Sequence, residues 1–153
     1  MWRRGRPPDL PTILLAEKND SLRRLLGKLL AEEGYRVLGA GTRRAVLAQL
    51  RDAPRIDLVI ADGGIRGMPV WDIVQETTWL RPGVPFVRLI EERTDALPAY
   101  GVGPSAEALL QKPVTIIALL AAIESLLATA QAAPTVARAA GAAVRTGDAS
   151  AVR

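Results

Sequence analysis

The sequence predicts one doubly wound α/β domain, a three-layer sandwich with a five-stranded parallel sheet in the order 2-1-3-4-5. Two observations carry this prediction. Short, nearly continuous apolar runs recur along the chain, and the intervals between them place apolar residues at helical steps of three and four. Buried strands that alternate with helices pair in parallel through right-handed crossovers, so helices cover both faces of the sheet. The length of 153 residues suits one domain with some tail.

The five apolar runs are the predicted strands. They are Thr12–Ala16, Tyr35–Ala40, Ile56–Ala61, Phe86–Ile90 and Ala108–Gln111. Most are apolar at consecutive positions rather than at alternate ones, which is typical of strands buried on both faces.

Helical spacing fills the intervals between the strands. Five leucines between Leu22 and Leu30 define the first helix, with Asp20 or Ser21 as its expected N-cap. Thr42 is expected to cap the second helix in the same way.

The second half of the chain repeats the alternation. A third helix contains Trp71 and ends near Trp79. The stretch Glu91–Tyr100 is a weaker helix because Pro98 interrupts it. Thr115 is expected to cap a strongly apolar last helix.

The two ends of the chain differ from its middle. Residues 1–10 form an Arg/Pro-rich tail, residues 11–130 the domain, and residues 131–153, with nine alanines, a tail expected to be flexible. The net charge of +4 comes from the ends, because residues 10–130 hold 14 basic and 14 acidic side chains. Nucleic-acid binding by the domain is therefore not expected.

The composition excludes several kinds of chemistry. The absence of cysteine excludes disulfides and thiolate nucleophiles, and the absence of histidine excludes imidazole metal sites, Ser-His-Asp triads and phosphohistidine on this chain. The longest uninterrupted apolar stretch, Ile116–Ile123, is too short to span a membrane, and the Arg-rich start does not match a signal peptide. We expect a cytoplasmic protein.

Charged residues stand where the predicted strands end. Glu17 and Lys18 follow the first strand, Asp62 follows the third, and Lys112 follows the fifth. The carboxyl ends of parallel strands meet at one edge of the sheet, so these distant side chains are expected to lie close together.

Four stretches of this sequence resemble the receiver domains of two-component response regulators (the CheY-like family). They are ILLAEKND, DLVIADGGIRGMPVWDIV, VPFVRLIEE and LLQKPVTIIALLAAI. The resemblance covers about residues 11–130 and implies a flavodoxin-like fold and a single-domain response regulator in phosphorelay signal transduction.

The resemblance also implies site residues and partners. Asp62 matches the carboxylate that takes a phosphoryl group from a sensor histidine kinase or a phosphotransfer protein, and Lys112, before Pro113, matches the lysine that pairs with the phosphoryl oxygens. Glu17, Asp62 and the carbonyl of Gly64 match the ligands of a Mg²⁺ ion. An anionic nucleophile that attacks a phosphoryl group needs such cations around it.

The sequence departs from the family pattern at several positions. Lys18 stands where a second metal-binding acid belongs, Ile90 replaces a Ser/Thr, and Leu109 replaces an aromatic residue. We therefore expect weak or conditional phosphorylation, with Lys18 as a candidate to neutralise the acids in place of the metal. Arg66 and Arg88 are expected to be solvated.

Two alternatives to a phosphorylated receiver stay open. The first is a pseudo-receiver that binds partners without phosphorylation, or dimerises through the face formed by the fourth helix, fifth strand and fifth helix. The second is a small α/β enzyme or cofactor binder on the same fold. A flavin site would need a Ser/Thr/Gly-rich loop after the first strand, and this chain has none there. We therefore favour a signalling module over an enzyme.

Overall fold

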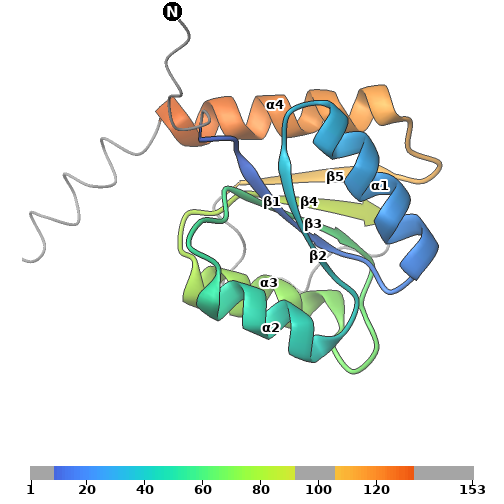
Figure 1. Cartoon of the computed structure of the whole chain (residues 1–153), viewed down its shortest axis with the longest axis vertical. Coiled ribbons are helices and arrows are strands. Elements are labelled where there is room, and N and C mark those ends of the chain that lie inside the picture. The colour runs from blue at the N-terminus through green and yellow to red at the C-terminus, as the bar shows by residue number, and fades with distance from the viewer. Residues whose placement is uncertain (1–8, 92–105, 133–153) are drawn as a thin grey trace, which may run out of the picture.

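Five parallel strands form a single sheet in the order β2-β1-β3-β4-β5 (Figure 1). The structure is a computed structural model, and it describes residues 9–91 and 106–132. The strands are β1 (Thr12–Ala16), β2 (Arg36–Ala40), β3 (Leu58–Asp62), β4 (Phe86–Ile90) and β5 (Glu107–Gln111). This topology confirms the predicted doubly wound fold, and the strand bounds differ from the predicted ones by at most two residues.

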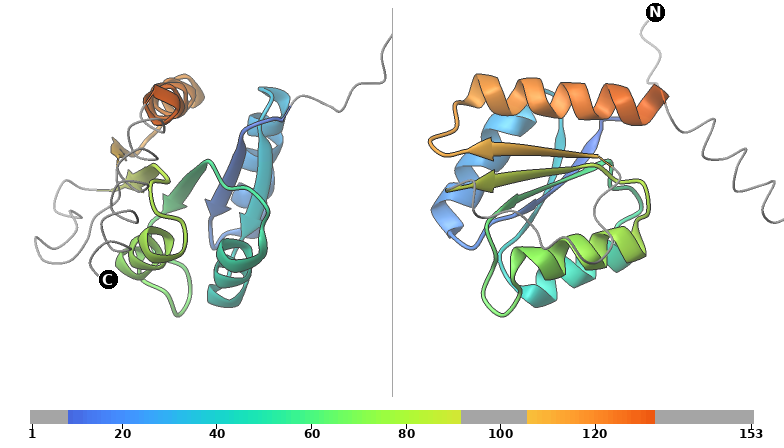
Figure 2. Two further views of the ribbon diagram at one scale, coloured as in Figure 1. Left: turned by 90° about the vertical axis from the view of Figure 1, so that its left-hand side faces the viewer. Right: turned by 180° about the vertical axis from the view of Figure 1, so that it is seen from behind.

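Helices cover both faces of the sheet. They are α1 (Asp20–Glu32), α2 (Arg43–Asp52), α3 (Val70–Leu80) and α4 (Ile116–Ala132). Figures 1 and 2 show α1 and α4 on one face and α2 and α3 on the other, which makes three layers. In the described part of the chain, no helix has the length and apolar character needed to cross a membrane.

Two of the three predicted helix caps are correct. Thr42 and Thr115 each accept a hydrogen bond at 3.1 Å from the backbone N–H three residues further on. At α1 the prediction was wrong, because Asn19 caps the helix and its side chain accepts from the N–H of Leu22 at 2.9 Å. Asn19 keeps an extended backbone, whereas Asp20 is already inside the helix.

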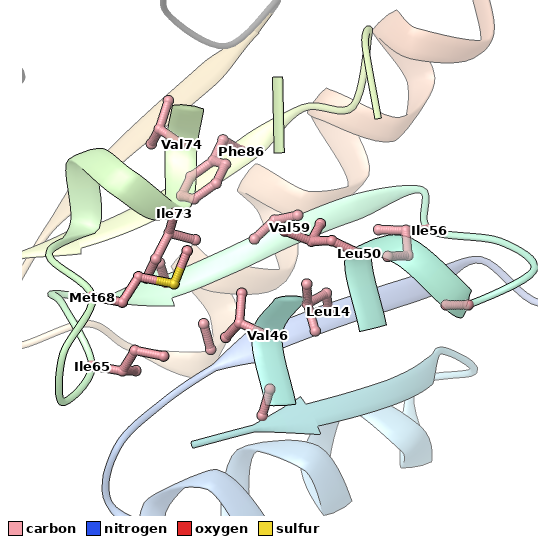
Figure 3. Close-up of a cluster of buried hydrophobic side chains, with 14 residues drawn as sticks. Leu14, Val46, Leu50, Ile56, Val59, Ile65, Met68, Ile73, Val74 and Phe86 are labelled. Carbon is pink, nitrogen blue, oxygen red and sulfur yellow. The ribbon is translucent and has the colours of Figure 1, made fainter. Parts of the chain in front are cut away.

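Alternation along the strands divides the core into two clusters. Leu14 of β1 packs with Phe86 of β4 and the apolar faces of α2 and α3 (Figure 3). Ile13 and Leu15 point the other way and pack with Ile123 and the remaining apolar residues of α1 and α4. Both faces of β1, β3 and β4 are therefore buried, which explains their continuous apolar sequences.

Three predictions fall wholly or largely outside the described residues. They are the weak helix at Glu91–Tyr100 and the two tails at 1–10 and 131–153. The face formed by the fourth helix, fifth strand and fifth helix is described only in its strand, β5, and its last helix, α4.

Candidate functional site

The carboxyl edge of the sheet brings together residues that are far apart in the sequence. Asp62 is the last residue of β3 and is buried, and Lys112 follows directly after β5. The Lys112 ammonium forms an ion pair with Oδ1 of Asp62 and lies 3.8 Å from Oε1 of Glu91. The predicted proximity of Asp62 and Lys112 is therefore present.

The backbone around Lys112 fixes the start of its side chain. The N–H of Lys112 donates to the carbonyl of Ile90 at 2.8 Å, which extends the pairing of β4 and β5 by one residue. The peptide bond between Lys112 and Pro113 is cis.

Glu17 occupies the other side of the same edge. Its side chain is buried, with 2% of the residue exposed, and Oε1 accepts from the N–H of Asn19 at 2.9 Å. The second oxygen, Oε2, is buried and has no hydrogen-bond partner within the described ranges.

The electrostatics of this edge follow from two neighbouring carboxyl groups and one ammonium. Burial, reinforced by the adjacent Asp62 carboxyl, raises the pKa of Glu17 to about 7. Partial burial lowers the pKa of Lys112, but the hydrogen bond and charge of Asp62, with the charges of Glu91 and Glu17, outweigh it and raise that pKa overall.

Lys18 does not take the position expected for it. Its side chain is exposed, and it forms no ion pair with Glu17 or Asp62 among the described residues. Successive residues of an extended chain point in opposite directions, so the inward position of Glu17 turns Lys18 outward. The cation beside Asp62 is Lys112 instead.

Arg88 also corrects an expectation. It is buried rather than solvated, and its Nε lies 3.1 Å from Oε1 of Glu107 on the adjacent strand. Because β4 is covered on both faces, a side chain at position 88 is buried whatever its chemistry, and a partner on β5 offsets the cost of burying its charge. Ile90 is buried on the same strand, Leu109 is about half exposed, and Arg66 is solvated as expected.

Gly64 is expected to contribute a backbone carbonyl. It follows Gly63, whose φ of 64° favours glycine. A Cβ on Gly64 would lie 3.0 Å from Cα of Pro69 and 3.1 Å from the carbonyl oxygen of Met68, so the loop leaves no room for a side chain.

Sequence reasoning missed Arg23. Its Nη1 donates to the carbonyl of Glu17 at 2.9 Å, and its Nη2 pairs with Oδ1 of Asp20 at 2.6 Å. The sequence signal that could have revealed it is the pair of glycines at 39 and 41, whose missing side chains leave room for the guanidinium.

Two hollows adjoin this edge. A mainly apolar pocket of about 510 Å³ opens beside Asp62 and Lys112, between Leu22 and Leu26 of α1 and the start of α4. A polar groove of about 1050 Å³ lies on the other side, over the ends of β1 and β2 and the loop after β3.

The residues at the carboxyl edge of the sheet offer oxygen atoms, which are the ligand atoms that suit a magnesium ion. Mg²⁺ prefers carboxylate and carbonyl oxygens and keeps several waters. Glu17 and Asp62 supply two neighbouring carboxyl groups, and the buried Oε2 of Glu17 has no hydrogen-bond donor among the described residues. Within residues 9–91 and 106–132 no group of three or more acidic side chains is placed to hold a metal, so side chains alone do not complete such a site there.

Comparison with known proteins gives similarity of structure. No protein-family model matches the chain, and no curated protein matches it. A response regulator receiver domain protein from Clostridium thermocellum is similar with a TM-score of 0.67 and 24% identity, over 80% of this chain and 98% of that one. The response regulator protein TrrA from Thermotoga maritima, in complex with Mg²⁺ and BeF, has a TM-score of 0.64 and 22% identity, over 76% and 99%.

A third similar structure carries a different description. It is adenylate cyclase from Rhodopirellula baltica, with a TM-score of 0.71 and 15% identity, over 86% of this chain and 98% of that one. All three sequence identities are below 25%, so these structural similarities establish a shared architecture and no more. That architecture is the flavodoxin-like fold of receiver domains. Function must be argued from the site itself.

Proposed function

We propose that this chain is a response regulator receiver of cytoplasmic two-component signalling, with Asp62 as a weakly or conditionally used phosphoacceptor. The observation that carries this proposal is the ion pair between Asp62 and Lys112 at the carboxyl edge of the parallel sheet. This ion pair places the nucleophilic carboxylate of Asp62 next to the Lys112 ammonium, which can pair with the phosphoryl oxygens after transfer. The partner is a sensor histidine kinase or a phosphotransfer protein, and the chain acts as a signalling module rather than an enzyme.

The proposed chemistry is phosphoryl transfer to a carboxylate. An oxygen of Asp62 forms a bond to phosphorus while the bond from phosphorus to the partner's imidazole nitrogen breaks. The electron pair of that bond stays on the imidazole, which takes up a proton, and Asp62 becomes an acyl phosphate. Lys112 moves its ion pair from the carboxylate to the new phosphoryl oxygens.

Glu17, Asp62 and the carbonyl of Gly64 are the residues that would hold Mg²⁺. When bound, the ion supplies two positive charges that offset the repulsion between the carboxylate and the phosphoryl group. The chain's own contribution is to bury Glu17 with Oε2 unpaired and to hold Gly64 where no side chain fits.

Two departures from the family pattern make the reaction slow in this proposal. Lys18 removes a carboxylate from the metal ligands, and Ile90 removes a hydroxyl donor to the phosphoryl group. Loss of one preorganised donor costs about 2.7–4 kcal/mol, or roughly 10²–10³-fold in rate. Such losses do not add simply when the groups act together.

The test is the intact mass of the protein after incubation with acetyl phosphate, with and without Mg²⁺. We expect slow, incomplete and Mg²⁺-dependent addition of one phosphoryl group. The Asp62→Asn variant should show none, whereas Asp52→Asn, which changes an exposed carboxylate at the end of α2, should react as the wild type does. Absence of labelling in the wild type under both conditions would contradict the proposal.

Restoring the missing acid gives a sharper version of this experiment. Lys18→Asp replaces the exposed ammonium that follows Glu17 with a carboxylate, which favours the approach of Mg²⁺ to the edge, and it should raise the Mg²⁺-dependent labelling rate by about tenfold. An unchanged rate would mean that position 18 does not limit the reaction.

One observation favours a second candidate, a pseudo-receiver that binds partners without phosphorylation. Ile90 is buried and has no hydroxyl, and Leu109 is an aliphatic side chain that is 46% exposed, so the hydroxyl and the aromatic ring that the family pattern places at these two positions are absent. Amide NMR spectra with beryllofluoride and Mg²⁺ separate the two candidates. Shifts that reach β4 and β5 favour a phosphorylation switch, and shifts confined to the Asp62 edge favour the constitutive module.

A further inference from the structure

The polar groove beside the Asp62 edge has a strongly basic lining. Its volume is about 1050 Å³, and its charged lining residues are Lys18, Arg23 and Arg66 against a single acid, Asp20. Two acids of the described chain that lie near the groove do not offset this charge. Glu17 is turned into the interior, and Asp62 is paired with Lys112.

Arg23 is held in place at the floor of this groove. Two of its five N–H donors are used, one on the carbonyl of Glu17 at 2.9 Å and one on Asp20 at 2.6 Å. Its Cδ lies 3.3 Å from where a Cβ of Gly39 would be, and a Cβ on Gly41 would overlap Nη1. A guanidinium fixed in this way loses little conformational entropy when it binds an anion.

The other two cationic side chains that line the groove form no ion pairs in the described part of the chain. Lys18 and Arg66 are exposed and form none among the described residues. Arg43 and Arg44 begin α2 beside the groove, and Arg43 makes a 3.3 Å hydrogen bond to the carbonyl of Gly67. Positive side chains in the first turn of a helix are disfavoured by its dipole, so this concentration of charge is unfavourable unless an anion offsets it.

We propose that this basic groove binds the oligophosphate group of a small molecule. Arginine matches phosphate oxygens with two parallel donors, and the three cationic side chains that line the groove suit an anion that carries several phosphates. Among residues 9–91 and 106–132, no aromatic side chain lines the groove, so this part of the chain offers no stacking surface for the bases of a nucleic acid strand. The groove adjoins the proposed magnesium site, because Gly64 also lines it, but the proposal does not depend on phosphorylation of Asp62.

The first test uses inorganic tripolyphosphate as the probe in calorimetric titrations of the full chain, with EDTA present. We expect saturable binding at one site. Lys18→Ala combined with Arg66→Ala should weaken it by about tenfold or more, as expected for the loss of charge-assisted hydrogen bonds. The matched control, Lys28→Ala with Arg51→Ala, removes the same charge from exposed positions outside the groove and should change affinity by less than about twofold.

A second variant separates geometry from charge. Gly41→Ala keeps every charge but displaces the Arg23 guanidinium, and it should weaken binding about as much as the loss of one cation of the groove. Gly27→Ala is its control, because that Cβ would meet only Cγ1 of Val37, at 3.7 Å. Thermal melts of both variants verify that they are folded.

Several outcomes would overturn the proposal. They are absent binding, equal weakening by the two double variants, or tighter binding of a thymidine oligonucleotide than of tripolyphosphate. ATP identifies the source of the oligophosphate: affinity equal to that of tripolyphosphate means that the phosphates alone are recognised, and tighter binding means that the nucleoside contributes. Asp62→Asn should bind as the wild type does, so failure of the phosphoacceptor proposal would leave this result intact.

Discussion

At the scale of single residues, the carboxyl group of Glu17 is the feature with the most direct consequence for stability. It is buried next to another carboxyl group, and its Oε2 has no hydrogen-bond partner in the described part of the chain. Its pKa is raised from 4.5 to about 7. Between those values the folded state binds more protons than the unfolded state, so the free energy of unfolding decreases as the pH rises.

The prediction is that stability falls between about pH 4.5 and pH 7 and then levels off, in EDTA. Glu17→Gln should remove most of this slope and stabilise the protein above pH 7 by about 2 kcal/mol, because no buried charge then forms. Urea unfolding at a series of pH values measures this. The control is Glu33→Gln on the exposed surface, and an unchanged slope in Glu17→Gln would show that another group titrates.

The candidate site could be predicted from the sequence only in part. The proximity of Asp62 and Lys112 is predictable because each stands at the carboxyl end of a parallel strand, and these ends share one edge of the sheet. Lys18 was misplaced because its direction depends on the one-residue alternation after β1. Arg88 was misplaced because its burial depends on packing from both sides of β4, and Arg23 was missed because its role depends on β2, far along the chain.

At the scale of elements, α1 contains a glycine in its interior. Gly27 lies between Asp20 and Glu32, the ends of the helix, and a side chain there would meet only ordinary van der Waals contact with Val37. Glycine in a helix interior costs about 0.5–1 kcal/mol relative to alanine because more backbone entropy is lost on folding.

Gly27→Ala should therefore stabilise the protein by about 0.5–1 kcal/mol and raise its Tm by about 2–4 °C. Differential scanning calorimetry measures the change. Asn19→Ala, which removes the side-chain cap of α1, should act in the opposite direction by about 1 kcal/mol. A lower Tm for Gly27→Ala would mean that α1 and β2 pack too closely to accept a methyl group.

Element positions followed from local sequence more closely than helix caps did. Each strand was predicted within two residues because its apolar run ends at polar or glycine residues. The cap of α1 was one residue off because Asn19, Asp20 and Ser21 are all good capping residues, and only the backbone conformation chooses among them.

At the scale of the whole molecule, the sheet separates two apolar clusters that stabilise the fold from both sides. Phe86 is the sole phenylalanine of the chain and is fully buried in the cluster under α2 and α3 (Figure 3). Trp79 is also aromatic but is 82% exposed on α3.

Phe86→Ala should destabilise the protein by about 3–5 kcal/mol, because it removes buried apolar surface and leaves a cavity. Trp79→Ala should change stability by no more than about 0.5 kcal/mol, because its side chain is already in water. Urea unfolding followed by circular dichroism compares the two. Similar losses for both would contradict the two-cluster description of the core.

The ion pair between Asp62 and Lys112 has a mechanical consequence for the whole sheet. It joins the ends of β3 and β5, which are not neighbours because β4 lies between them. It therefore connects β3 to the residue after β5 across the intervening strand β4, and it holds the start of the segment that enters α4. Any event that draws the ammonium away from Asp62 breaks this connection, and Lys112 lies only a few residues before α4, so we expect the start of that helix to respond.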